Sequence, residues 1–127
     1  MKLFIIISHY LRLSQAIKEY LTKMLIQTDN VKIEAIGGLE NGEVLGTQPL
    51  ELLEVINNYP NINEIFIFPD LGSASLTAES ITSMLNNKQI YISRGGIVEN
   101  TFAAYVLANS GAGFQEVVDA CKEPIIK

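Results

Sequence analysis

The sequence predicts an α/β fold in which a doubly wound, mainly parallel sheet of four strands carries helices on both faces. Four short apolar runs alternate with segments of helical periodicity, the connections between them are short, and two of the runs contain a continuous rather than alternating apolar stretch. Continuously apolar strands are typical of a parallel sheet that is covered on both sides. Alternating strands and helices with short connections favour right-handed crossovers and this layered architecture.

The four predicted strands follow the apolar runs at residues 3–8, 31–36, 64–68 and 89–93. The first contains three consecutive isoleucines at positions 5–7, and the third contains the run Ile-Phe-Ile-Phe at 65–68. Because neither run alternates between apolar and polar residues, both strands are expected to be buried on both faces of a parallel sheet.

Five helices are predicted from apolar spacing and from start and stop signals. The first is about four turns long, and Pro49 marks the start of the second, where a missing N–H costs nothing. Ser73 or Ser75 can cap the third, and the fourth ends near Gly111. The residues expected on the apolar stripes of the first three helices are Leu13, Ile17, Tyr20, Leu21, Met24, Leu25, Leu52, Leu53, Ile56, Leu76, Ile81, Met84 and Leu85. The last two helices are indicated by Phe102, Tyr105 and Val106 and by Phe114, Val117, Val118 and Cys121.

Composition limits the classes of protein that this sequence can encode. The 127 residues are 48% hydrophobic and 18% charged, which predicts one core-forming domain over residues 1–127 and excludes a disordered chain. The net charge of -5 makes nucleic acid an unlikely partner. His9 is the single histidine and Cys121 the single cysteine, so a multi-histidine metal site and an internal disulfide are excluded. No metal and no cofactor are expected.

The apolar start of the chain resembles a signal peptide in its first residues only. Its apolar run stops at Ser8 and His9, and no cleavage site follows. No other run reaches the roughly 18 apolar residues that a membrane span needs. We therefore expect a cytoplasmic protein that does not associate with membranes.

Two polar residues follow the strands that are expected to be neighbours, His9 after the first and Asp70 after the third. Ligands of such sheets bind outside the carboxyl ends of the strands, where the strand order reverses. A carboxylate at Asp70 could accept the Nδ1–H of His9, fix the tautomer and leave Nε2 as a nucleophile. Two alternatives remain open: His9 caps the strand end by hydrogen bonding, and Asp70 caps the third helix.

Glycine-rich loops suggest what His9 could attack. Gly37–Gly38, Gly42 and Gly46 allow a tight backbone, and Thr47 and Ser73 each precede a predicted helix start. Backbone N–H groups that converge at helix starts form an anion site, and a phosphoryl group on Nε2 would need such donors. The alternative is that these are turn and helix-end glycines, which we prefer for Gly37–Gly38 taken alone.

Several other site classes lack parts that they require. The chain has neither the glycine-rich fingerprint after its first strand nor a Gly-Lys-Ser/Thr sequence, which excludes dinucleotide-binding and P-loop sites. A receiver domain needs an acidic pair for magnesium where Ser8 and His9 stand. Ser8 and His9 point to opposite faces as neighbours on a strand, which disfavours a Ser-His-Asp hydrolase.

Four segments, taken in order, resemble a known family. They are Ile-Ser-His-Tyr at 7–10, the Gly-Gly to Gly-Thr loop at 37–47, Asp-Leu-Gly-Ser-Ala at 70–74 and Val-Glu-Asn-Thr-Phe-Ala-Ala at 98–104. Together they resemble the phosphocarrier subunit of the phosphoenolpyruvate-dependent dihydroxyacetone kinases, which is related to the mannose-type IIA (EIIA) domains of the sugar phosphotransferase system. The sequence departs from the family pattern at Asn41, at Asn100 and at residues 94–96.

The resemblance implies a mannose-type EIIA fold, a homodimer and a phosphohistidine intermediate. It implies that His9 accepts a phosphoryl group from HPr and passes it to ADP on the ADP-binding kinase subunit, with Asp70 orienting His9. Some relatives carry fused HPr-like and enzyme-I-like domains; at 127 residues this chain is expected to lack both, so separate proteins are expected to supply the phosphoryl group. The residues expected in the loops around the phosphate are Gly38, Gly42, Thr47, Leu71, Gly72 and Ser73.

Other hypotheses remain open from the residues alone. A mannose-type EIIA component would pass the phosphoryl group to a sugar transporter, and a non-catalytic module would bind a small anion or a regulatory partner in the same crevice. Arg12 could meet the phosphate or be a solvated helix residue, and Glu99 has the same ambiguity. Cys121 is expected to be a small core residue. The candidates for a dimer interface, if exposed, are Phe102, Tyr105 and Phe114.

Overall fold

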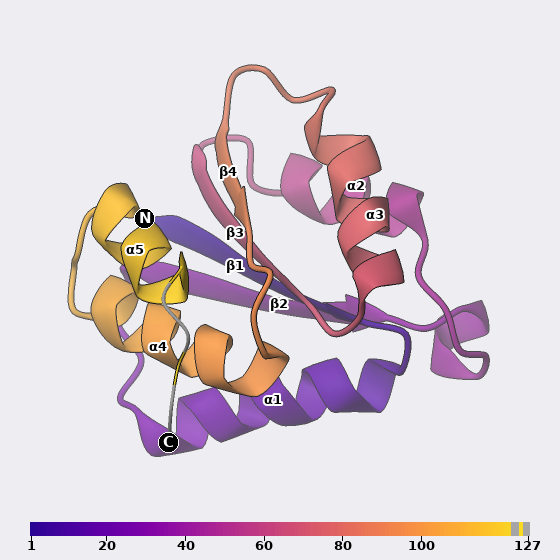
Figure 1. Ribbon diagram of the computed structural model, residues 1–127, viewed down its shortest axis with the longest axis horizontal. Helices are drawn as coiled ribbons and strands as arrows, with labels where there is room; N and C mark the ends of the chain where they lie inside the picture. The colour runs from indigo at the N-terminus through magenta and orange to yellow at the C-terminus, as the bar shows by residue number, and fades with distance from the viewer. Residues whose placement is uncertain (123–124, 126–127) are drawn as a thin grey trace.

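The computed structural model describes residues 1–122 and 125, and its strands and helices alternate as predicted (Figure 1). A single 3-10 turn, η1, is the one short element that the pattern did not indicate. The order along the chain is β1 (Lys2–Ser8), α1 (Leu11–Met24), β2 (Val31–Gly37), η1 (Glu40–Gly42), α2 (Pro49–Asn57), β3 (Glu64–Pro69), α3 (Gly72–Thr82), β4 (Gln89–Ile92), α4 (Ile97–Asn109) and α5 (Phe114–Lys122).

The sheet has the order β2-β1-β3-β4, and all of its pairs are parallel. The predicted doubly wound α/β fold is confirmed, because the chain winds from β1 to β2 on one side and then crosses to β3 on the other. At the carboxyl end, Ser8 is paired with Gly37 of β2, and Ile7 with Pro69 of β3. The strand order therefore reverses between β1 and β3, directly before His9 and Asp70.

Helices cover both faces of the sheet and enclose two separate cores. On one face α1, α4 and α5 pack against the Phe4 and Phe66 side of the strands, and Tyr105 lies at its centre. On the other face α2 and α3 pack against Ile5 and Ile67 (Figure 1). Successive strand side chains point to opposite faces, so both faces of β1 and β3 are buried. This explains the continuously apolar runs.

Some predicted core residues are exposed instead. The buried positions of α1 include Ser14, whose single hydroxyl hydrogen is shared between the carbonyls of Leu11 and Ile36, each 2.9 Å from Oγ. Those of α3 include Ala74 and Ala78. Small residues thus take some of the inward positions beside Ile17, Leu21 and Ile81, and other large apolar residues are turned outward. The prediction of an inward-facing position was wrong for Leu13, Tyr20, Met24, Leu76 and Met84, which are exposed.

The end of β2 requires a glycine at Gly37. Its φ is +142°, and a Cβ there would lie 1.8 Å from the carbonyl oxygen of Ser8. We expect Gly37→Ala to lower the free energy of unfolding by about 2–4 kcal/mol, measured by urea denaturation. Gly72→Ala is the matched control, because a Cβ there meets nothing within 4 Å. Equal losses in the two variants would contradict this account.

Within the described residues, no helix combines the length and the apolar character that crossing a bilayer requires.

Candidate functional site

His9 and Asp70 lie side by side at the carboxyl ends of β1 and β3. Nδ1 of His9 is 3.0 Å from Oδ1 of Asp70. The side chain of His9 is 24% exposed and that of Asp70 is 10% exposed. The ring is therefore neither in the apolar core nor free on the surface: one edge is held by the carboxylate while the other faces outward.

Asp70 is surrounded by hydrogen-bond donors. Its Oδ1 also accepts from the backbone N–H of Leu71 at 2.8 Å, and its Oδ2 accepts from the Ser8 hydroxyl at 3.0 Å and from the His9 backbone N–H at 3.1 Å. Burial pushes the pKa of Asp70 up, but the hydrogen bonds from His9 and Ser8 and the charge of the His9 ring outweigh it and lower that pKa. An ionised carboxylate accepts only, so the Nδ1 facing it carries a proton, and in the neutral ring Nε2 then has the lone pair.

The opposite ring nitrogen faces α3. The Ser73 hydroxyl oxygen is 2.7 Å from Nε2 of His9. With the proton of His9 on Nδ1, the hydroxyl donates to the lone pair of Nε2. The predicted capping role of Ser73 or Ser75 was wrong, because the N-cap of α3 is Leu71 and no side chain caps it. Sequence reasoning had placed Ser73 near a bound phosphate and had missed its direct contact with the imidazole.

The start of α3 presents further donors at this position. Gly72 and Ser73 are the first two residues of the helix. Backbone N–H groups in a first helical turn have no partner within the helix, and the helix dipole is positive at this end. A negatively charged group on Nε2 of His9 would therefore meet both a hydroxyl and the positive end of α3.

Three glycines of the loop at 37–47 already donate their backbone N–H groups to carbonyl oxygens of the protein. Gly38 donates to the carbonyl of Ser8 at 3.2 Å, Gly42 donates within the loop at 2.9 Å, and Gly46 donates to the carbonyl of His9 at 2.9 Å. Gly38 and Gly42 line a cavity of about 470 Å³ that includes neither His9 nor Asp70. The loop is thus fastened to the strand end that carries His9, in agreement with the turn interpretation.

Thr47 is linked to Ser73 through Thr77. Its hydroxyl is 2.9 Å from that of Thr77, and Thr77 donates to the carbonyl of Ser73 at 3.1 Å. Because each hydroxyl has one hydrogen, Thr47 is the donor in their shared bond. Thr47 therefore supports the first turn of α3 and does not touch His9. Arg12 is exposed on α1 and forms no ion pair with another described residue.

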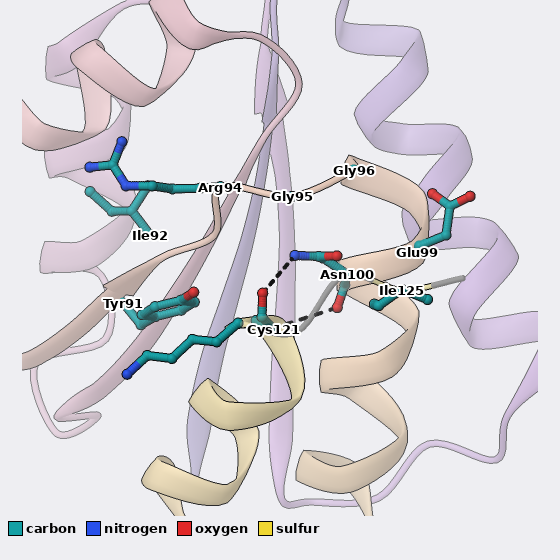
Figure 2. Close-up of a pocket in the computed structure, with 10 residues that line it drawn as sticks. Tyr91, Ile92, Arg94, Gly95, Gly96, Glu99, Asn100, Cys121 and Ile125 are labelled. Carbon is teal, nitrogen blue, oxygen red and sulfur yellow. Dashed lines mark hydrogen bonds between the residues drawn. The ribbon is translucent and has the colours of Figure 1, made fainter. Parts of the chain in front are cut away.

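Two cavities lie near the carboxyl ends of β3 and β4. One of about 250 Å³ adjoins the site and is lined by Asp70, Leu71 and Gly72 together with Arg94. The other, of about 570 Å³, lies between β4, α4 and α5, includes Glu99 in its lining and excludes His9 and Asp70 (Figure 2). Arg94 and Gly95 line both and separate them.

Asn100 links the elements that surround the larger cavity. Its side-chain amide donates to the Ser93 hydroxyl at 2.9 Å. It also donates to the carbonyl of Cys121 at 3.2 Å (Figure 2), so it ties the end of β4 to the end of α5. Burial raises the pKa of the Cys121 thiol to about 11. Cys121 is 5% exposed and packs in the core, which confirms the prediction for it.

Comparisons with known proteins show which proteins this chain resembles. The chain is 30% identical over 126 residues to the phosphoryl donor subunit DhaM of PEP-dependent dihydroxyacetone kinase 2 from Listeria innocua, covering 97% of this chain and 92% of that one. It is 28% identical over 123 residues to the phosphotransferase subunit DhaM of the PTS-dependent dihydroxyacetone kinase from Lactococcus lactis, covering 97% and 95%.

Other relatives are much longer than this chain. The chain is 29% identical over 119 residues to the phosphoryl donor subunit DhaM from Klebsiella michiganensis, and it spans 25% of that protein's length. Among solved structures, EF1359, a protein of unknown function, matches with a TM-score of 0.86 and 26% identity over 100% of this chain and 98% of that one. The family model described as PTS system fructose IIA component matches residues 3–118, so the chain belongs to the EIIA-man family.

Proposed function

We propose that the chain is a phosphohistidine carrier in which His9 accepts a phosphoryl group from HPr and passes it to ADP bound on the ADP-binding subunit of a dihydroxyacetone kinase. The observation that carries the proposal is the state of the His9 ring, whose Nδ1 faces Asp70 while Nε2 faces Ser73 at the start of α3. The printed names of the DhaM relatives support the dihydroxyacetone kinase as the destination. The homodimer and the cytoplasmic location are parts of this proposal.

The chemistry needs one nucleophilic nitrogen and no proton movement at the ring. The lone pair on Nε2 of His9 forms a bond to phosphorus as the N–P bond to the donor histidine breaks, and the donor ring recovers that electron pair. Nδ1 keeps its proton throughout. The ring gains positive character when Nε2 is phosphorylated, and the ionised Asp70 at 3.0 Å from Nδ1 stabilises it.

The phosphoryl group would be held by the start of α3. Ser73 must turn its hydroxyl away from Nε2 before transfer, and the same hydroxyl can then donate to a phosphoryl oxygen. The backbone N–H groups of Gly72 and Ser73 supply further donors. Leu71 positions this turn as its N-cap. Gly38, Gly42 and Thr47 keep supporting roles in the proposal, because their resolved contacts shape the loops around His9.

A second candidate is favoured by the description of the matching family model, which names the fructose IIA component of a phosphotransferase system. In that case the chemistry at His9 is the same, and the acceptor is a component of a sugar transporter. The two candidates therefore differ in the molecule that receives the phosphoryl group.

Reconstitution with labelled phosphoenolpyruvate, enzyme I and HPr tests the proposal. We expect one acid-labile phosphate on the chain, followed by ATP formation when the ADP-loaded kinase subunit is added. Transfer to a sugar-transporter component, with none to ADP, would favour the second candidate. Absence of labelling by phosphorylated HPr, with phosphate or sulfate still bound, would contradict both carriers and favour an anion-binding module.

A further inference from the structure

The cavity of about 250 Å³ beside Asp70 has one cationic side chain among the described residues that line it, Arg94. Arg94 follows β4, and Figure 2 shows its side chain extending away from Asn100 and Glu99. It points toward α3, where its Nη2 lies 2.5 Å from Oε1 of Glu79. Because Asp70 and Gly72 line the same cavity, Arg94 shares a cavity with the start of α3, the element that we propose to hold the phosphate.

The ion pair between Arg94 and Glu79 can be opened at low cost. The side chain of Arg94 is 72% exposed and that of Glu79 is 39% exposed. Exposed ion pairs contribute little to stability, since water solvates both partners and screens their attraction. Arg94 is therefore available to a stronger anion, and Glu79 competes with that anion for the guanidinium.

The two half-reactions of the proposed function place different charges at this cavity. When His9 is phosphorylated, one phosphoryl group moves between two imidazole rings and no further phosphate is introduced. When phosphorylated His9 reacts with ADP, the phosphates of the acceptor approach a phosphoryl group that is itself negative. Asp70 and Glu79 add to the repulsion. The second half-reaction alone therefore brings additional negative charge to this cavity, which a cationic side chain there would offset.

We propose that Arg94 is a specificity-determining residue that leaves Glu79 and binds a phosphate of a nucleoside diphosphate acceptor at this cavity. The inference rests on the proposed carrier function and names the group that would recognise its acceptor. The planar guanidinium can donate two hydrogen bonds to one phosphate, and such charge-assisted pairs are strong. A terminal phosphate oxygen of the diphosphate bonds to phosphorus, the N–P bond breaks, and its electron pair returns to Nε2 of His9. Arg94 keeps its protons.

The test measures the half-reactions separately for Arg94→Gln, Arg94→Lys and Glu79→Gln. The first assay follows labelling of the chain by phosphorylated HPr, and the second follows ATP formation from the purified phosphorylated chain and the ADP-loaded kinase subunit. We expect Arg94→Gln to leave the first rate unchanged and to lower kcat/KM of the second about 10- to 100-fold. Arg94→Lys should restore part of that loss, because it keeps the charge but not the planar fork.

Glu79→Gln separates recognition from a merely structural ion pair. Both Arg94→Gln and Glu79→Gln break the pair, so equal losses in the second half-reaction would overturn the proposal. We expect Glu79→Gln to match or exceed the wild-type rate, since it frees the guanidinium. Equal losses of Arg94→Gln in both half-reactions, or none in either, would also overturn it. Failure of the carrier function would show differently, because the wild-type chain would then form no phosphohistidine or transfer nothing to ADP.

Discussion

Replacing His9 with glutamine is expected to abolish phosphorylation of the chain by phosphorylated HPr, with a loss of at least about 1,000-fold in rate. Glutamine offers an amide where the ring has a lone pair on Nε2, so no N–P bond can form. Since His9 is the sole histidine in the sequence, no second imidazole can replace it. The measurement is transfer of labelled phosphate from phosphoenolpyruvate through enzyme I and HPr, followed by a comparison of acid and alkali stability of the label.

Arg12→Gln is the matched control for this variant. Arg12 is the second residue of α1, the helix that follows His9, but it is exposed and lies outside the His9, Asp70 and Ser73 contacts. We expect this variant to keep phosphorylation within about threefold of wild type, since solvated surface residues contribute little. An acid-labile label that persists in His9→Gln would contradict the assignment of His9 as the acceptor.

The sheet could be predicted because strands buried on both faces leave a direct trace in the sequence. Isoleucines at 5–7 and the apolar run at 65–68 lie in the two central strands, β1 and β3. Once these strands are neighbours, parallel pairing brings the residues after them together. This is why the proximity of His9 and Asp70 followed from the pattern, and the 3.0 Å contact confirms that proximity.

The inward faces of the helices and the contacts between side chains were harder to predict from the sequence. A pattern of large apolar residues does not register Ser14 or Ala78 as inward positions, yet both are fully buried. The hydroxyl of Ser14 is satisfied by two carbonyls, so it can be buried without an orphaned polar group. The contact between Ser73 and Nε2 depends on how α3 begins relative to β1, and no local signal in the sequence specifies that position.

Asp70→Ala is expected to slow phosphorylation of His9 by about 10- to 1,000-fold at saturating phosphorylated HPr. Without the carboxylate, Nδ1 loses the acceptor that holds its proton, and the positive character of the phosphorylated ring loses its counter-charge. Asp70→Asn is expected to be at least as slow. Each carboxylate oxygen accepts from two donors, so the amide nitrogen of asparagine would face a backbone N–H in either orientation. If that nitrogen took the place of Oδ1, it would also donate to Nδ1 and impose the tautomer with its proton on Nε2.

Ser8→Ala tests whether the effect of Asp70 comes from its contact with His9 or from the other hydrogen bonds at the end of β1. It removes one donor to Asp70 and an acceptor for the Tyr10 N–H but leaves the bond to Nδ1 intact. We expect a loss of about 1 kcal/mol in the free energy of unfolding and a transfer rate within about threefold of wild type. An Asp70→Ala rate equal to that of Ser8→Ala would reduce Asp70 to a structural residue.

The lowered pKa of Asp70 gives the same carboxylate a measurable effect on stability. The pKa of an aspartate in the unfolded chain is about 3.9, and the pKa of Asp70 in the folded chain is lower. Folding therefore favours the ionised form. The stabilisation is complete above the unfolded value and disappears as the pH falls through the folded one. Urea denaturation should therefore show a larger difference between wild type and Asp70→Ala near neutral pH than at about pH 3. A difference that stays constant over this range would mean that packing, and not the charge held by His9 and Ser8, accounts for it.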